Sequence, residues 1–145
     1  MKKGFTLIEL LITISIIGIL VAISLFGLSG IRETSRDSRR KSDLESVRSG
    51  LELYKSDCNS YPAVIPNPTF PLNGSGETTS CSASNEYISS WPADPMSGSR
   101  NYLYSLTATS GYEMCASLEQ GGTTVTCGGA SNCGTATCNY KVTNP

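Results

Sequence analysis

A run of 22 residues without a charged side chain, from Leu10 to Ile31, constrains this chain more than any other feature. An α-helix rises about 1.5 Å per residue, so a helix of this length spans roughly 33 Å, enough to cross the hydrocarbon core of a bilayer. Glu9 lies at the N-terminal edge of the run. A carboxylate that reaches the middle of a bilayer costs about 2.5–3.5 kcal/mol, so its presence there needs a reason.

Three interpretations of this segment compete. A secretory signal peptide would have Lys2 and Lys3 as its basic end and a small-x-small cleavage site at residues 22–24, but the helical pattern continues well past Ser24. A plain single-span anchor would leave the free-energy cost of placing Glu9 in the bilayer unexplained. In the third interpretation, Glu9 pairs with a positive charge at the start of a neighbouring helix, because intramembrane carboxylates usually have such a partner.

The composition is that of a small domain built for an oxidising compartment. The 145 residues leave room for one domain, and the formal net charge of −1 gives no electrostatic reason to bind nucleic acid. The chain has no histidine, the commonest general base and nitrogen ligand, so we expect no enzyme, no metal and no cofactor. All six cysteines lie beyond the apolar run without a CxxC pair, which predicts disulfides. They are Cys58, Cys81, Cys115, Cys127, Cys133 and Cys138.

A helical pattern continues past the apolar run. Apolar residues recur at steps of three and four, and no proline precedes Pro62, so the sequence predicts one helix over about residues 5–57. Asn59 is a suitable left-handed terminator for it. The second half of the helix, residues 32–57, should lie on a sheet with its apolar face. That face comprises Leu44, Val47, Leu51, Tyr54 and Cys58.

The rest of the chain predicts loops followed by strands. Residues 58–100 are rich in proline and in turn-forming residues. Short strand patterns follow at 102–106, 112–118, 123–126 and 140–143. One long helix followed by several short strands predicts an α+β fold, with a small antiparallel sheet on the second half of the helix.

The positions of the cysteines favour one pairing. Cys58 lies at the expected end of the helix, Cys81 lies in the loop region, and no other cysteine precedes residue 115. A bond between them would pin the proline-rich region to the helix, with a stabilisation of about 2–4 kcal/mol. The remaining four would pair within the C-terminal sheet, in an order that the sequence leaves open: Cys115, Cys127, Cys133 and Cys138.

Residues 2–9 carry a family resemblance. The order Lys-Lys-Gly-Phe-Thr-Leu-Ile-Glu, followed at once by the apolar run, resembles the prepilin signal of type IV pilins and the related pseudopilins. The resemblance implies that a prepilin peptidase cuts after Gly4 and that Phe5, the new N-terminus, is N-methylated. It also implies that Glu9, the fifth residue of the mature chain, is needed for assembly into a filament.

Physical chemistry supports that role for Glu9. Cleavage would expose an α-amino group on Phe5 with an unperturbed pKa of about 8, and a methylated amine remains basic. Glu9 of one subunit can then pair with the Phe5 ammonium of the next. In lipid an unpaired member of such a pair is costly, so the pair would fix the register of stacked helices.

The resemblance implies four segments and a structural, non-enzymatic role. These are a leader over residues 1–4, a membrane-spanning and filament-core helix over 5–31, an amphipathic continuation over 32–57 and an extracellular loop and sheet domain over 58–145. The chain would be a single-pass cytoplasmic-membrane protein before assembly and part of a cell-surface filament afterwards. Its partners would be other pilin subunits, the prepilin peptidase, membrane assembly machinery and the lipid bilayer.

Two alternatives stay open at this point. One is a minor pilin at a filament tip, whose 58–100 loop or sheet binds DNA or a surface ligand. The other is a monomeric, single-span anchored extracellular domain, which would not depend on Glu9. Nucleic-acid binding has little support, because removal of Lys2 and Lys3 leaves more acidic than basic residues.

Two further features bear on topology and metals. Residues 32–41 hold five basic side chains, which by the positive-inside rule would place the C-terminal side in the cytoplasm. The cysteines and the resemblance indicate the opposite location.

Near residue 94, only Asp94, Asn85 and Asn101 supply side-chain oxygens, well short of the six to eight oxygen ligands that calcium takes. We therefore expect a structural turn around Asp94.

Overall fold

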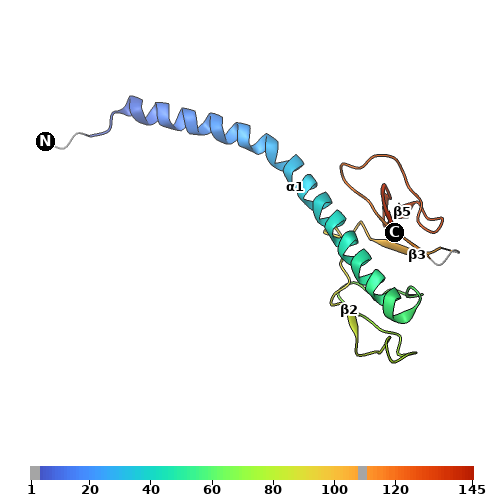
Figure 1. Cartoon of the computed structure of the whole chain (residues 1–145). Coiled ribbons are helices and arrows are strands. Elements are labelled where there is room, and N and C mark those ends of the chain that lie inside the picture. Colours follow the sequence, from blue (N-terminus) through green and yellow to red (C-terminus); the bar gives the residue numbers. More distant parts are fainter. Residues whose placement is uncertain (1–3, 108–110) are drawn as a thin grey trace. The chain divides into compact units, whose positions relative to one another are not determined.

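A computed structural model of the chain describes residues 4–107 and 111–145 (Figure 1). The described residues form two compact units, which divide between Ser35 and Arg36. Helix α1 (Leu7–Cys58) contributes to both units and is 52 residues long. Asn59, at φ 57°, takes the left-handed conformation that ends many helices, as the sequence predicts.

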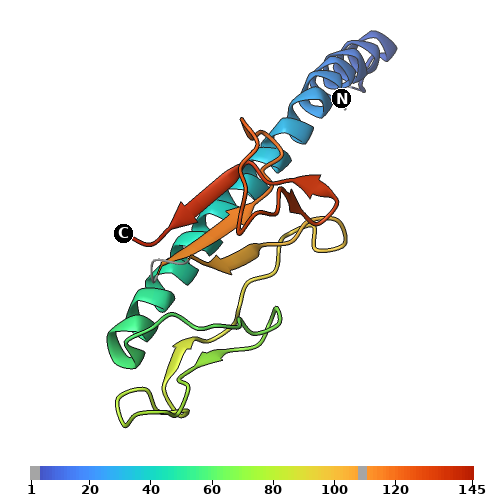
Figure 2. The same ribbon diagram turned by 90° about the vertical axis from the view of Figure 1, so that its right-hand side faces the viewer.

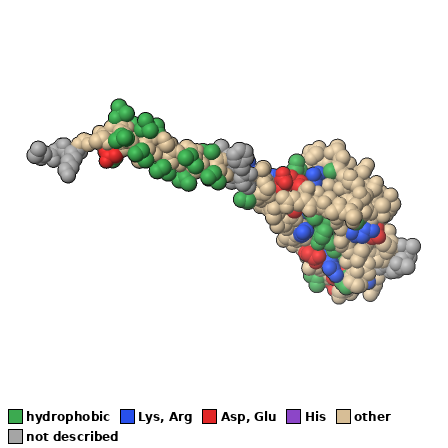
Figure 3. Space-filling model, turned by 90° about the horizontal axis from the view of Figure 1, so that it is seen from above, with side chains coloured by type: hydrophobic (Ala, Val, Ile, Leu, Met, Phe, Trp, Pro, Cys, Tyr) green, Lys and Arg blue, Asp and Glu red, His purple; other side chains and the backbone are tan. Residues whose placement is uncertain are grey.

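In the first unit, helix α1 presents apolar side chains that no described residue covers. An 18-residue window here has a mean hydropathy of 2.7 and is 0% buried. By length and composition, this is one helix that could cross a membrane. Figure 3 shows hydrophobic side chains along the exposed segment. A surface of this kind requires lipid or other apolar protein around it.

In the second unit, helix α1 packs on the sheet through the predicted apolar face. Leu44, Val47, Leu51 and Tyr54 are buried and Cys58 is partly buried, in one core with Met114 of the sheet. Gly50 lies against the segment at Ile88 so closely that a Cβ would collide with the Ile88 side chain. The interpretation of the stripe as core packing is confirmed.

The main sheet has three antiparallel strands in the order β3-β4-β7 (Figure 2). They are β3 (Leu103–Leu106), β4 (Tyr112–Ala116) and β7 (Tyr140–Thr143). The register places Met114 of β4 opposite Tyr104 on one side and Val142 on the other. The α+β fold class is therefore confirmed, with α1 packed against a small antiparallel sheet.

Two short hairpins were not predicted. The first pairs β1 (Leu72–Asn73) with β2 (Glu86–Ile88), within the region expected to be loop only. The second pairs β5 (Asn132–Cys133) with β6 (Ala136–Thr137). In the second hairpin, Gly134 has φ 87°, a conformation that favours glycine.

The strand predicted at residues 123–126 is wrong. These residues lie between β4 and β5 and form no strand in the described structure. Within this segment, the Val125 N–H donates a backbone hydrogen bond to the Cys138 carbonyl at 2.8 Å. Gly121 and Gly122 precede the segment, and Gly128 and Gly129 follow it. Glycine is depleted in strands, so these flanks disfavour a strand despite the threonine-rich pattern.

The packing predicts a large difference between two leucines of α1. Leu51 is fully buried, whereas Leu53 is 61% exposed. Leu51→Ala should destabilise the second unit by about 2–5 kcal/mol through lost burial and the cavity left behind. Leu53→Ala is the matched control and should change stability by less than about 0.5 kcal/mol. Chemical denaturation of the full chain in detergent, followed by tyrosine and tryptophan fluorescence, measures both; equal effects would contradict the packing.

Candidate functional site

The start of helix α1 holds Glu9 in a local hydrogen-bonded arrangement. Thr6 precedes the helix, and its backbone N–H and hydroxyl donate to Glu9 Oε2 at 2.9 and 2.7 Å. In return the Glu9 N–H donates to Thr6 Oγ1 at 3.3 Å. Threonine followed three residues later by glutamate is a capping box, which satisfies N–H groups that the first helical turn leaves without partners.

The capping box leaves half of the carboxylate available. Glu9 Oε2 accepts both bonds from Thr6, and no hydrogen bond to Oε1 is present among the described residues. Glu9 is exposed, as are the apolar side chains that follow it. The site thus offers one free carboxylate oxygen on an otherwise apolar surface, which suits a cationic partner from outside the chain.

Gly4 and Phe5 precede the helix in an open conformation. Phe5 is 86% exposed, and nothing lies within 4 Å of the position that a Cβ on Gly4 would take. Both residues are therefore accessible on the same short segment that leads to Glu9. Lys2 and Lys3 of the predicted leader lie outside the described residues.

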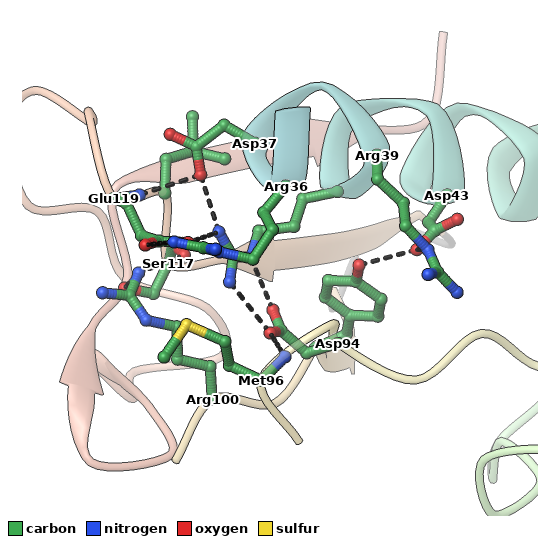
Figure 4. Close-up of polar contacts among 12 residues, drawn as sticks. Arg36, Asp37, Arg39, Asp43, Asp94, Met96, Arg100, Ser117 and Glu119 are labelled. Atoms are coloured by element: carbon green, nitrogen blue, oxygen red, sulfur yellow. Dashed lines mark hydrogen bonds and ion pairs between the residues drawn. The ribbon is translucent and has the colours of Figure 1, made fainter. Parts of the chain in front are cut away.

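The second unit contains a buried charge cluster that the sequence did not reveal (Figure 4). Arg40 of α1 is 0% exposed and makes ion pairs with three carboxylates. Its Nε and Nη2 donate to Asp94 at 2.8 and 3.0 Å, in a two-pronged contact. Its Nη1 donates to Asp37 at 2.7 Å and to Glu119 at 2.8 Å. One guanidinium therefore joins the helix, the 91–96 loop and the segment after β4.

The carboxylates of this cluster are satisfied from several directions. The backbone N–H groups of Glu119 and Gln120 donate to Asp37 at 2.9 and 2.8 Å. Asp94 Oδ1 also accepts the Met96 N–H at 2.7 Å, which makes the structural turn expected at Asp94. Arg36 Nε donates to Glu119 at 2.6 Å, so Glu119 has two arginine partners.

The electrostatics of the cluster favour its charged forms. Hydrogen bonds from Arg36, and then from Arg40, lower the pKa of Glu119 to about 2, although burial opposes the charge. Burial also works against the charged Asp37 carboxylate, but the backbone N–H groups of Gln120 and Glu119 and the Arg40 side chain outweigh it and lower the pKa of Asp37. Three carboxylates around Arg40 raise the pKa of its guanidinium against the effect of burial.

The cluster changes the interpretation of the basic segment at residues 32–41. Arg40 is buried and Arg36 is engaged with Glu119, so the five basic side chains do not form one free patch. Asp37, in the same segment, is only 6% exposed. Among the described residues no group of three or more His, Cys, Asp or Glu side chains could hold a metal ion.

The six cysteines occupy two regions of the second unit. Cys58 and Cys81 form a disulfide with a Cα–Cα distance of 4.8 Å, which ties the end of α1 to the loop before β2. Cys133 and Cys138 form a second disulfide across the β5–β6 hairpin. Cys115 and Cys127 are buried and unbonded in this structure, so it holds two of the three expected bridges.

Comparisons with known proteins agree with the N-terminal arrangement. The family model described as "Prokaryotic N-terminal methylation motif" matches residues 1–25. The chain is 33% identical over 108 residues to type II secretion system core protein G of Pectobacterium carotovorum subsp. carotovorum, covering 65% of this chain and 62% of that protein. No solved structure matches the chain significantly.

The N-terminal motif and these similarities support the type IV pilin and pseudopilin family for this chain. Within that family it is similar to further proteins named type II secretion system core protein G. The one from Escherichia coli (strain K12) is 30% identical over 101 residues, covering 65% of this chain and 66% of the relative. The one from Vibrio cholerae serotype O1 is 29% identical over 109 residues, covering 70% of each. The chain thus spans just under two thirds of the length of the first two relatives.

The charge cluster predicts that Arg40 is essential for stability. Arg40→Met removes the guanidinium and leaves three carboxylates in a buried site without their partner, which should cost about 3–5 kcal/mol. The matched control is Arg39→Met, because the Arg39 side chain is 66% exposed and its contact with Asp43 is 3.9 Å long. This control should change stability by less than about 0.5 kcal/mol. Denaturant titration of both variants checks the prediction, and an equally mild Arg40→Met would contradict it.

The same cluster predicts acid sensitivity. Since the pKa of Glu119 is about 2 in the folded chain against an ordinary value of 4.5, its stabilising contribution is complete above the ordinary value. It is lost as the pH falls from about 4.5 towards 2. The melting temperature should therefore fall over this range, and Glu119→Gln should make the fall smaller. Identical pH profiles for the two proteins would contradict the role of Glu119.

Proposed function

We propose that this chain is a structural subunit of a type IV pilus-like filament, of the pseudopilus kind that serves type II secretion. The observation that carries the proposal is the carboxylate of Glu9. It lies at the start of an uncovered apolar helix, with Oε2 held by Thr6 and Oε1 without a partner among the described residues. Such a group suits a cationic partner from another molecule.

The partner is the N-terminus of a neighbouring subunit. Cleavage between Gly4 and Phe5 frees an α-amino group on Phe5 that is mostly cationic at neutral pH, and methylation leaves it basic. Glu9 Oε1 accepts this ammonium group while the Thr6 bonds keep Oε2 oriented. The pairing neutralises two charges in lipid, where either alone would be costly.

The pairing also sets the arrangement of the helices. Glu9 lies four residues after Phe5, so a neighbour whose Phe5 meets this Glu9 is displaced along the axis by the length of this segment, which is roughly 6 Å when all of it is helical. Parallel helices with a constant displacement generate a helical filament, since a head-to-tail contact that does not close repeats indefinitely. The filament core is built from residues 5–31 of successive subunits.

The exposed apolar side chains supply the cohesion of the core. Before assembly they face lipid, and in the filament they face the same surface of neighbouring subunits. Examples are Leu10, Ile14, Ile17 and Leu20, each 58–59% exposed in the single chain. Close packing between helices replaces their contacts with lipid chains.

The remaining segments follow from this core. Residues 1–4 are the leader removed by a prepilin peptidase, residues 32–57 carry the helix into the second unit, and residues 58–145 lie outside the cytoplasm. The two disulfides support that location, because such bonds form in oxidising compartments. The subunit acts by binding other subunits and the membrane assembly machinery, without catalysis and without a cofactor. The names of the relatives favour protein secretion as the process that the filament serves.

Substitution at Glu9 tests the proposal. Glu9→Gln can still accept the Thr6 hydrogen bonds of the capping box, because glutamine also serves at that position. It cannot neutralise an ammonium group, so membrane insertion should be unchanged while the yield of sheared filaments falls by about a hundredfold or more.

The matched control is Glu33→Gln, which removes a carboxylate from the same helix beyond the apolar run and should assemble normally. Membrane fractionation and quantification of sheared filaments measure the two effects separately. Wild-type filament yield from Glu9→Gln would rule out the pairing.

A further inference from the structure

The two unbonded cysteines lie together in the second unit. Cys115 is 0% exposed and Cys127 is 3% exposed, and both belong to a buried cluster with the Cys133–Cys138 disulfide. The proposed function uses neither of them. Two thiols buried side by side in a domain with two disulfides raise the question of their oxidation state in the native protein.

Their surroundings bring the two sulfurs towards each other. Cys115 lies on the central strand β4, opposite Leu103 of β3. The Cys127 thiol donates to the Leu103 carbonyl at 3.8 Å, and the Cys115 thiol donates to the carbonyl of Thr126, the residue before Cys127, at 3.9 Å. Each sulfur therefore contacts the backbone beside the other, within one buried cluster.

We propose that Cys115 and Cys127 form a third disulfide in the native protein, installed when residues 58–145 reach an oxidising compartment. The pairing needs no change in the other two bonds, which already account for the remaining four cysteines. The proposal rests on the proposed function only for the location of this domain.

The thiols are unequal, which suggests an order for the reaction. The proximity of the two thiols lowers the pKa of Cys115 and raises the pKa of Cys127, and the nearby Lys141 ammonium also favours the Cys115 thiolate. Because Lys141 lies opposite Cys115 in the register of β4 and β7, Cys115 is assigned as the first nucleophile. It attacks a disulfide of an oxidised dithiol–disulfide oxidoreductase, forms a mixed disulfide and releases one oxidant thiolate.

The second step closes the bond within the chain. Cys127, as its thiolate, attacks the Cys115 sulfur of the mixed disulfide and releases the second oxidant thiolate. The two protons lost by Cys115 and Cys127 end on the two thiols of the oxidant, which is reduced by two electrons. Because both sulfurs are buried in the folded domain, this exchange takes place during folding or through local opening of the segment that covers them.

The bond would secure the segment that follows the Glu119 contacts of the charge cluster. Between β4 and β5, residues 119–126 are mostly exposed and belong to no strand. The Val125 bond to Cys138 and the Cys127–Ala130 turn supply the backbone hydrogen bonds that hold the adjoining stretch. A cross-link from Cys127 to the central strand would fix the whole segment over the sheet.

A thiol count on the native full chain tests the pairing. The chain is purified in detergent without reductant, after acid quenching, and is then denatured and treated with N-ethylmaleimide. Glutamyl endopeptidase cleaves after Glu113 and Glu119, which separates the Cys115 peptide from all other cysteines. We expect no maleimide label, and we expect the 114–119 peptide to remain joined to the C-terminal peptide until reductant is added.

Variants identify the partner and the effect. Cys127→Ala should leave one label, on Cys115, and release the 114–119 peptide without reductant. The double variant Cys115→Ala/Cys127→Ala should raise the unfolding equilibrium constant by about a hundredfold, as expected for a bond that closes a loop of this size. It should also speed cleavage after Glu119 in the folded protein.

Three results would overturn the proposal. Maleimide on Cys115 and Cys127 alone, with the other four cysteines bonded, would show that the native pair is reduced, and would leave the proposed function intact. Maleimide on all six would overturn both the third bond and the extracytoplasmic location. A label pattern that pairs Cys115 with Cys133 or Cys138 would also exclude the proposed bond.

Discussion

An apolar helical surface that the chain itself does not cover is the constraint on which the rest of the structure depends. From Leu7 to Ser24 the side chains of α1 are exposed, so this surface requires lipid or other apolar protein around it. Glu9 distinguishes the N-terminal end of this surface, because its carboxylate lies at the edge of the apolar run. The Thr6 capping box holds one of its oxygens and leaves the other for a cation.

The same helix meets a different requirement in the second unit. There, Arg40 is buried with Asp37, Asp94 and Glu119, and the cluster joins three segments that lie far apart in sequence. A buried ion pair of this kind adds little stability compared with an apolar core, but it tolerates only one arrangement of its partners. It therefore fixes how the loop before β3 and the segment after β4 sit on the helix. Arg40 shows how partners within the chain keep a charge in an apolar setting, whereas in the proposed filament the partner of Glu9 comes from another subunit.

The sequence predicted what depends on local pattern. The long helix, its buried stripe and its end at Asn59 follow from spacing and backbone preference, and strands β3, β4 and β7 follow from alternation. The N-terminal motif is also local, since Gly4, Phe5 and Glu9 lie within six residues.

What depends on distant partners could not be predicted. The charge cluster joins residues 54 and 79 positions apart. One signal was present, because Asp37 and Arg40 continue the apolar stripe backwards from Leu44 at steps of four and three. Charged side chains in line with an apolar stripe are compatible with a buried ion pair and with a solvent-exposed face. Which of the two forms depends on partners that are distant in sequence. The incorrect prediction of a strand at 123–126 also depended on distant partners, because none of the described strands pairs with this segment.

The central claim is that the chain is processed to expose an amine that neutralises Glu9 of the next subunit. Zero-length carbodiimide cross-linking of native membranes tests it most directly, because the reagent joins a carboxylate to an amine only when they are in contact. It requires a primary or secondary amine, which a singly methylated Phe5 retains. Mass spectrometry should find an amide between Glu9 of one chain and an N-terminal Phe5 of another, with residues 1–4 absent. A chain that still begins at Met1, with Glu9 unlinked in assembled material, would contradict the account.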